Sequence, residues 1–388
     1  MRNTRRNIKK MAAGNDDDYD AASAVAEFHE SRGGVHGLLE SGVTTVPLIF
    51  LTPPTASPWP PSPAPFAFPV VDLSLPRAHT VELVRAAASS LGVFYVTNHG
   101  VQQTTTTIID SAISAVRAFH EQPRAARSAF YSPLLSATRH VAYSTIPNPA
   151  LRPGQPAAHP LLPWRDSLIV QFNDSGGSSS AQPAGDLPQV CRDDLLEYHR
   201  FLTGFGKEIM ALLSEALGLA AERIDQTLQV QGSPMVCHYY PPCPEPSRVV
   251  GAREHTDASL FTVLAEDRVG GLQVWLDDKG GGDGGWVDVP PVAGALLINI
   301  GDVLKVISND DYKSVEHRVV INFSREARVS IALFFRPANC GESDFFGPLP
   351  ELLTEGRPAR YKNLTFPQLM NYRRELGHAR SSLDGFKI

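Results

Sequence analysis

A few side chains in the second half of the sequence have the types and spacing needed to bind a metal ion and a small diacid. His255 and Asp257 lie two residues apart in "REHTDASLFTVLAED" (253–267), which reads as one strand, so alternation places both on one face. In a chain with 12 histidines and 41 acidic residues, such a pair is expected about once by chance, and alone it reads more simply as a polar strand edge. The same alternation adds Ser259, Phe261 and Val263 to that face and turns Thr256, Ala258, Leu260 and Thr262 away, with Thr256 expected only to pack.

The segment "SVEHRVVINFSREARVSIALFF" reads as two strands joined by a turn at "NFSREA". A hairpin symmetric about Phe323 and Ser324 would place His317 opposite Ser330. Alternation would then point Arg328 to the same face. One face of this strand pair is therefore expected to gather a histidine, an arginine and a serine.

Two neutral imidazoles and one carboxylate form the facial ligand set that suits non-haem Fe(II). They leave adjacent coordination positions open for a bidentate ligand and O2. His255 and Asp257 from one strand, with His317 from a neighbouring strand, fit that geometry. The sequence therefore predicts an Fe(II) site formed by these three residues.

An arginine eleven residues after His317 supplies what a 2-oxo diacid needs at its far end. The inner carboxylate and the oxo group would chelate iron. The planar Arg328 guanidinium would bind the distal carboxylate bidentately, with the Ser330 hydroxyl beside it. Tyr240 shares a strand face with His238 and could donate its phenol to that carboxylate; a core tyrosine is the alternative reading.

Short β-rich runs separated by turn residues must position these groups. Between 234 and 336 they are "PMVCHYY", "LFTVLAED", "GLQVWL", "WVDVP", "ALLINIG", "SVEHRVVI" and "RVSIALFF". Many short strands with turn signals are typical of a sandwich or barrel. Upstream, apolar residues at helical spacing predict one face of a long amphipathic helix, formed by Leu195, Leu202, Phe205, Ile209, Leu212 and Ala216.

These patterns divide the chain into successive regions. Eight prolines within 53–69 disfavour both a helix and a central strand, so residues 1–66 are expected to be a flexible extension with a proline-rich linker. Residues 67–187 form a mixed helix and strand region with a flexible insertion at 173–186. The remaining regions are a long supporting helix (188–232), the β-rich core with the metal site (233–337) and a helical C-terminal cover (338–388).

Composition argues against several classes of function. A formal charge of −6 and an isoelectric point near 6.1 provide no broad cationic field, so we expect no nucleic-acid or membrane partner. No apolar run is long enough to predict a transmembrane helix. The four cysteines form no CxxC pair, which favours the reducing cytoplasm over a disulfide-linked secreted fold. We expect a monomer that binds a small-molecule substrate.

Three further side chains are candidate substrate contacts. Phe334 follows Arg328 and Ser330 on one strand face, at its open end, where it either stacks on the substrate or packs in the core. Trp164 in "PWRD" could line the pocket, as could Arg165 beside it, although core packing is the more common outcome for a tryptophan. His238 shares the face of Tyr240.

Together these motifs resemble the plant soluble 2-oxoglutarate and Fe(II)-dependent dioxygenases. The similar stretches are "HYYPPCPEP", "HTD" with its preceding glycine, "SVEHRVV", "RVS", "NHG" and "PWRD". The stretches "GVHGLLESGVTTVPLIF", "RAFHEQP" and "LDGFKI" narrow the resemblance to the branch of 1-aminocyclopropane-1-carboxylate oxidase homologues, which includes a benzoxazinoid-pathway hydroxylase. The resemblance covers roughly residues 28–388.

The resemblance implies a mainly β fold with flanking helices, a double-stranded β-helix or distorted, cupin-like jelly roll. It carries the iron ligands onto His255, Asp257 and His317, and the 2-oxoglutarate contacts onto Arg328, Ser330 and Tyr240. It also implies O2 as a co-substrate and ascorbate as a supporting reductant. Two departures are His238, where many relatives have asparagine, and a spacing from His317 to Arg328 that is one residue longer than common. The longer spacing affects the shape of the turn, not the ligand set.

We therefore expect a 2-oxoglutarate-dependent dioxygenase that hydroxylates or otherwise oxidises a small specialised metabolite and releases succinate and CO2. An ethylene-forming oxidase of 1-aminocyclopropane-1-carboxylate shares the triad and the R-x-S, but the long N-terminal extension argues against it. A metal-binding jelly roll without redox chemistry would not need Arg328 and Ser330. A zinc hydrolase would need a general base, and the sequence offers none beside the triad.

Overall fold

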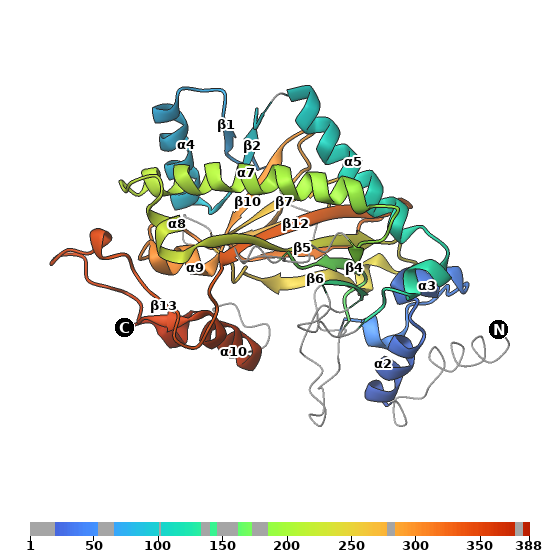
Figure 1. Ribbon diagram of the computed structural model, residues 1–388. Helices are drawn as coiled ribbons and strands as arrows, with labels where there is room; N and C mark the ends of the chain where they lie inside the picture. The colour runs from blue at the N-terminus through green and yellow to red at the C-terminus, as the bar shows by residue number, and fades with distance from the viewer. Residues whose placement is uncertain are drawn as a thin grey trace.

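Two β-sheets face each other at the centre of the molecule, and helices cover the outer face of the larger one (Figure 1). The computed structural model describes residues 20–52, 66–100, 102–132, 140–145, 162–172, 185–277, 284–376 and 383–388. In order across the larger sheet, the strands are β1 (Val70–Asp72), β2 (Val93–Thr97), β10 (Leu296–Ile300), β7 (Phe261–Glu266), β12 (Arg328–Pro337), β5 (Val230–Tyr240), β4 (Asp166–Val170) and β3 (Val141–Ser144). The smaller sheet is β6 (Val250–His255), β11 (His317–Val320), β8 (Leu272–Leu276) and β9 (Gly285–Asp288).

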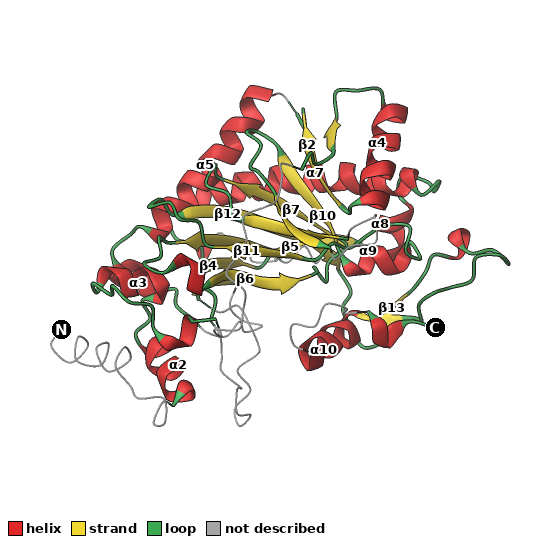
Figure 2. Ribbon diagram, turned by 180° about the vertical axis from the view of Figure 1, so that it is seen from behind, coloured by secondary structure: helices red, strands yellow, loops and turns green. Residues whose placement is uncertain are grey.

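Successive strands of the core alternate between the two sheets. β5, β7, β10 and β12 belong to the larger sheet, while β6, β8 with β9, and β11 belong to the smaller one (Figure 2). Every pairing within these two sheets except β1 with β2 is antiparallel. This connectivity is that of a jelly roll, so the predicted double-stranded β-helix is confirmed.

The predicted hairpin around Phe323 and Ser324 is wrong. β11 and β12 do not pair with each other, because the segment between them crosses from the smaller sheet to the larger one. His317 is therefore opposite His255 on one side and Val274 on the other, not opposite Ser330. The turn signal in "NFSREA" was correctly recognised, but a turn signal does not specify which sheet the next strand joins.

Helices α4 (Arg77–Ser90), α5 (Gln102–His120) and α7 (Arg192–Ala216) pack on the outer face of the larger sheet. All six residues of the predicted apolar face of α7 are buried, as expected. At Gly206 an added Cβ would lie 2.1 Å from the Phe335 ring, so α7 approaches β12 this closely only because residue 206 is glycine. The supporting helix is shorter than predicted: α7 ends at Ala216, and α8 (Arg223–Leu228) and the start of β5 fill the rest of 188–232.

The prediction that residues 1–66 form a flexible extension is wrong for 20–52. This segment forms α2 (Ala21–Glu30), α3 (Gly34–Glu40) and a short 3-10 helix, Leu48–Phe50. Val25, Phe28 and Phe50 are buried in the apolar core that extends between the sheets. Apolar side chains at helical spacing in "SAVAEF" and "VPLIF" were the available signal for this docking. Residues 1–19, the prolines from 53 to 65, and most of the predicted insertion at 173–186 lie outside the described residues.

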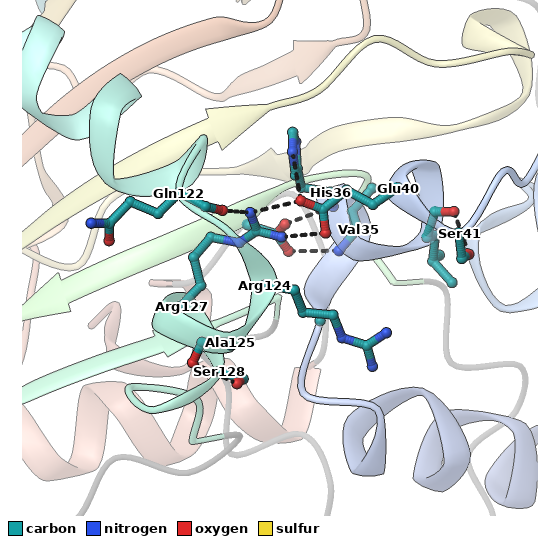
Figure 3. Close-up of polar contacts among 12 residues, drawn as sticks. Val35, His36, Glu40, Ser41, Gln122, Arg124, Ala125, Arg127 and Ser128 are labelled. Atoms are coloured by element: carbon teal, nitrogen blue, oxygen red, sulfur yellow. Dashed lines mark hydrogen bonds and ion pairs between the residues drawn. The ribbon is translucent and has the colours of Figure 1, made fainter. Parts of the chain in front are cut away.

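Two buried charged groups hold this N-terminal segment in place. Asp166 accepts hydrogen bonds from the backbone N–H groups of Val35 (2.8 Å) and His36 (2.9 Å) at the start of α3, and from the hydroxyls of Tyr143 (3.0 Å) and Thr145 (2.7 Å). Figure 3 shows the Arg127 guanidinium between the Glu40 carboxylate of α3 and the backbone carbonyl of Gln122. The distances from Arg127 to the two Glu40 oxygens are 3.0 and 2.8 Å.

The C-terminal region is less helical than predicted. It contains one α-helix, α10 (Phe366–Leu376), two 3-10 helices (Pro350–Leu352 and Asp384–Phe386) and a two-stranded sheet, β13 (Phe345–Phe346) with β14 (Leu364–Thr365). α10 and the N-terminal helices α2 and α3 lie at opposite ends of the molecule (Figure 1). None of the described helices is long and apolar enough to cross a membrane. All four cysteines are free.

Replacing Asp166 with alanine should destabilise the protein by at least about 3 kcal/mol, because three buried donors and one partly buried donor would lose their acceptor. Urea unfolding of the purified variant measures this loss. Asp110→Ala, at an exposed position of α5, is the matched control and should change stability by less than about 0.5 kcal/mol. Equal stability of the two variants would show that Asp166 does not hold α3 to the sheet.

Candidate metal centre

His255, Asp257 and His317 meet between the two sheets. One ligand atom from each residue lies within 4.8 Å of the other two. Asp257 Oδ1 is 3.8 Å from Nε2 of His255 and 3.7 Å from Nε2 of His317. His255 ends β6, and His317 begins β11 as its cross-strand partner, so sheet pairing itself brings the two imidazoles together.

Asp257 does not share a strand with His255, contrary to the sequence-based prediction. β6 ends at His255, and β7 begins only at Phe261, so Asp257 lies in the connection that carries the chain to the other sheet. The break resets the alternation of the side chains. Thr262, not Phe261 or Val263, therefore faces the metal centre, and the latter two pack in the core under the helices.

Hydrogen bonds from the Nδ1 atoms of His255 and His317 leave the Nε2 atoms of these residues free to bind a metal. Nδ1 of His255 lies 2.7 Å from the carbonyl oxygen of Arg253, and Nδ1 of His317 lies 3.2 Å from that of Val315. Each Nδ1–H can donate to its carbonyl, which leaves Nε2 with a lone pair for a metal.

The carboxylate of Asp257 is oriented in the same way. Its Oδ2 accepts hydrogen bonds from the Thr262 hydroxyl (2.6 Å) and from Nδ2 of Asn299 (2.9 Å), which leaves Oδ1 for a metal. Neither partner was predicted from the sequence. A polar asparagine inside the otherwise apolar run "ALLINIG" was the available signal for Asn299.

Electrostatics favour the protonation states that bind metal. Burial, and next the charge of His317, lower the pKa of His255 to about 3, so this imidazole is neutral near neutral pH. Burial raises the pKa of Asp257, but the two histidines and the two hydrogen bonds to Oδ2 outweigh burial and hold that pKa below its usual value. Two imidazole nitrogens and one carboxylate oxygen on one side of a site fit Fe(II).

Thr256, which was expected only to pack, links the metal centre to the C-terminal region. Its hydroxyl donates to Asp302 Oδ2 (3.0 Å), and Arg373 of α10 donates to that hydroxyl (3.0 Å) and to Asp302 Oδ2 (2.5 Å). The Asp302 backbone N–H in turn donates to the Asp257 carbonyl oxygen (2.7 Å). The turn that presents Asp257 is therefore anchored by a helix more than a hundred residues downstream.

Arg328, Ser330 and Tyr240 lie together in the pocket that also contains the metal ligands. Arg328 is 1% exposed, and its Nη1 donates to the Ser330 hydroxyl (3.1 Å). Its guanidinium carbon lies 4.9 Å from the centre of the Tyr240 ring, on the neighbouring strand. A second partner of Arg328 was not predicted: Glu266 of β7 accepts from Nη2 at 2.6 Å.

The three predicted substrate contacts divide into two groups. His238 and Phe334 line the pocket. Trp164 does not: its side chain is fully buried, packs edge-on against Phe50 at 5.2 Å between ring centres, and donates to the Pro241 carbonyl oxygen. The residue after it, Arg165, lines the pocket instead.

Comparison with known proteins agrees with this site. A family model described as the 2OG-Fe(II) oxygenase superfamily matches residues 231–337, and one described as non-haem dioxygenase in morphine synthesis N-terminal matches residues 68–188. The chain belongs to the 2OG-Fe(II) oxygenase superfamily. It is a 2-oxoglutarate-dependent dioxygenase whose cofactors are Fe(II) and 2-oxoglutarate.

Relatives place the dioxygenase in a plant branch of this superfamily. It is 38% identical to 1-aminocyclopropane-1-carboxylate oxidase homolog 4 of Arabidopsis thaliana, over 90% of this chain and 93% of that protein. Homolog 3 of the same plant is 38% identical over 95% of this chain and 98% of that protein. The crystal structure of JOX2 in complex with 2OG, Fe and JA is similar with a TM-score of 0.74 and 28% identity, over 92% of this chain and 97% of that one.

Thr262→Val should weaken Fe(II) binding by about 10- to 100-fold, because the Asp257 carboxylate would lose a hydrogen bond that orients it. Anaerobic titration with Fe(II) measures the dissociation constant. Thr203→Val, which removes a hydroxyl bonded within α7 at 2.9 Å, is the matched control and should leave iron affinity unchanged. Equal iron affinity in both variants would show that Thr262 does not orient the ligand.

Proposed function

We propose that this dioxygenase hydroxylates a small specialised metabolite while it converts 2-oxoglutarate to succinate and CO2. One observation carries the proposal: a single pocket between the sheets holds the His–Asp–His cluster together with a buried arginine, a serine and a tyrosine. That combination provides ligands for a metal and a clamp for a dicarboxylate.

In this proposal His255, Asp257 and His317 bind iron, and Arg328, Ser330 and Tyr240 hold the distal carboxylate of 2-oxoglutarate. The side chain of Arg328 is oriented before the co-substrate arrives, because Ser330 and Glu266 already contact it. When bound, Fe(II) supplies the oxidative chemistry with O2, and the protein supplies the orientation of the reactants. Its four free cysteines support a reducing compartment such as the cytoplasm.

The substrate is proposed to reach the iron from the end of the pocket that contains Phe334. On β12 the order along the pocket face is Arg328, Ser330, Ala332 and Phe334. Phe334 pairs with Thr262, the residue that contacts Asp257, so it is at the iron end, away from the arginine. Its ring offers an apolar surface for a small organic substrate. The JOX2 complex, which contains 2OG, Fe and JA, supports a small organic acceptor in a fold of this kind.

The catalytic proposal is tested by following succinate formation from 2-oxoglutarate by anaerobically purified protein supplied with Fe(II), O2 and a library of plant metabolites. At least one compound should stimulate succinate release. His255→Ala should abolish that release and weaken iron binding, whereas His79→Ala, at an exposed position of α4, should retain both. If no compound stimulates turnover and His255→Ala still binds iron, the proposal is wrong. Ethylene formation from 1-aminocyclopropane-1-carboxylate with ascorbate, without need of 2-oxoglutarate, would instead favour the oxidase.

Arg328→Ala should raise the KM for 2-oxoglutarate by about 10- to 100-fold, because the distal carboxylate would lose charge-assisted hydrogen bonds. The KM for the organic substrate should change much less. Steady-state kinetics with each substrate varied in turn measure both constants. An unchanged KM for 2-oxoglutarate would show that the clamp is misassigned.

A further inference from the structure

The carboxylate of Glu266 changes the charge at the dicarboxylate end of the pocket. Its Oε2 lies 2.6 Å from Arg328 Nη2, and the two side chains are only 7% and 1% exposed. Burial raises the pKa of Glu266, and the charge of Arg328 opposes that rise. With Glu266 ionised, the positive charge of Arg328 would already be balanced before any ligand binds. The distal carboxylate of 2-oxoglutarate would then bring a second negative charge to a single buried cation.

Three buried groups with a net charge of −1 are costly to hold away from water. The balance can be restored by a second cation near the distal carboxylate, or by a proton on Glu266. The first solution requires a cationic side chain that reaches the same end of the pocket and is not already paired.

Arg165 meets both requirements. Arg328 pairs with Tyr240 across β12 and β5, and Asp166 pairs with Tyr239 across β5 and β4. Arg165 immediately precedes Asp166, so it lies opposite Tyr240 across β4 and β5. This is the end of the pocket where Arg328 lies. β4, β5 and β12 are consecutive neighbours in the larger sheet (Figure 1).

The side chain of Arg165 points to the pocket side of the sheet. Ser167 lies two residues further along, and its hydroxyl contacts Nδ1 of the pocket residue His238 at 2.8 Å. Period-two alternation places Arg165 on the same face as Ser167, and Arg165 indeed lines the pocket. Burial is the largest cause that lowers the pKa of His238, and the charges of Arg165 and Arg328, which line the same pocket, come next.

Within the part of the chain that the structure describes, Arg165 has no counter-charge of its own. Its side chain makes no hydrogen bond or ion pair with any residue in the described ranges, and its Nε is buried without a partner. By contrast, Arg328 is held by Glu266 and Ser330. An arginine left without an anion in a pocket that binds a dicarboxylate is a candidate for that anion.

We propose that Arg165 is a second cation of the 2-oxoglutarate site and shares the distal carboxylate with Arg328, while Glu266 positions Arg328 and balances its charge. The inference rests on the proposed function and adds two residues to it. Arg165 contacts the co-substrate directly, and Glu266 acts through Arg328.

The test measures 2-oxoglutarate binding by calorimetry to the anaerobic Fe(II) protein, independently of turnover. Arg165→Gln should weaken binding by about 10- to 100-fold, and Arg165→Lys, which keeps the charge, should weaken it less. The matched control is Arg336→Gln on β12, which lines a different cavity and should bind 2-oxoglutarate as the unmodified protein does. Thermal unfolding and Fe(II) affinity of each variant verify that fold and metal site are retained.

Glu266→Gln provides the second arm. Removing its negative charge should tighten 2-oxoglutarate binding about three- to tenfold. In the Arg165→Gln background, Glu266→Gln should raise the affinity by clearly more than the three- to tenfold it gains alone, because Arg328 by itself can then balance the ligand. Additive effects of the two substitutions would contradict the shared charge balance.

Three results would overturn the inference. Arg165→Gln with unchanged 2-oxoglutarate affinity but a raised KM for the organic substrate would assign Arg165 to that substrate. A second result is unchanged 2-oxoglutarate affinity in Arg165→Gln, together with binding by the unmodified protein that weakens as pH rises. If Glu266→Gln abolishes this pH dependence, a proton on Glu266, and not Arg165, balances the charge of the ligand. If Arg165→Gln and Arg336→Gln weaken binding equally, the effect is not specific. Failure of the unmodified protein itself to bind 2-oxoglutarate would instead refute the proposed function.

Discussion

The buried carboxylate of Asp257 imposes the conditions that the rest of the metal centre meets. A carboxylate away from water needs positive or hydrogen-bonding partners on both oxygens. Thr262 and Asn299 provide them for Oδ2 from two adjacent strands of the larger sheet. Oδ1 instead faces the two imidazoles, where a divalent cation would complete its coordination. The same contacts that stabilise the charge thereby select which oxygen binds metal.

Meeting these conditions requires the two sheets to be held at a set separation. His255 and His317 belong to the smaller sheet, whereas Thr262 and Asn299 belong to the larger one. The helices add support from outside: α7 approaches β12 at Gly206, and the Arg373 side chain of α10 contacts the turn next to Asp257. Segments remote in sequence therefore contribute to the position of one carboxylate.

The same requirement for charge compensation applies at the other end of the pocket. There the buried charge that needs a partner is the cation Arg328, and the Glu266 carboxylate pairs with it. A buried ion pair orients a guanidinium well, but it also lowers the attraction that the arginine offers to an incoming anion. Arg165, which precedes β4 and has no ionic partner among the described residues, is proposed to supply the affinity that this ion pair withholds.

Side-chain types and their spacing along the chain were enough to predict the chemistry and most of the local structure. The residue types of the candidate metal centre, most strands of the core and the apolar face of α7 were predicted, because side-chain chemistry and hydrophobic periodicity are local properties. The family resemblance rested on the same local motifs, and the comparisons confirmed it.

How these pieces combine could be seen only in the folded protein. It placed β11 and β12 in different sheets, Asp257 in a connection and not on a strand, and the N-terminal helices on the core. Of the two neighbours expected at the pocket, it buried Trp164 in the core and left only Arg165 in the pocket lining. The physical reason is common to all of them: a turn or an alternation is specified by a few neighbouring residues, whereas the partner of a strand or a buried charge depends on contacts with residues far away in the chain.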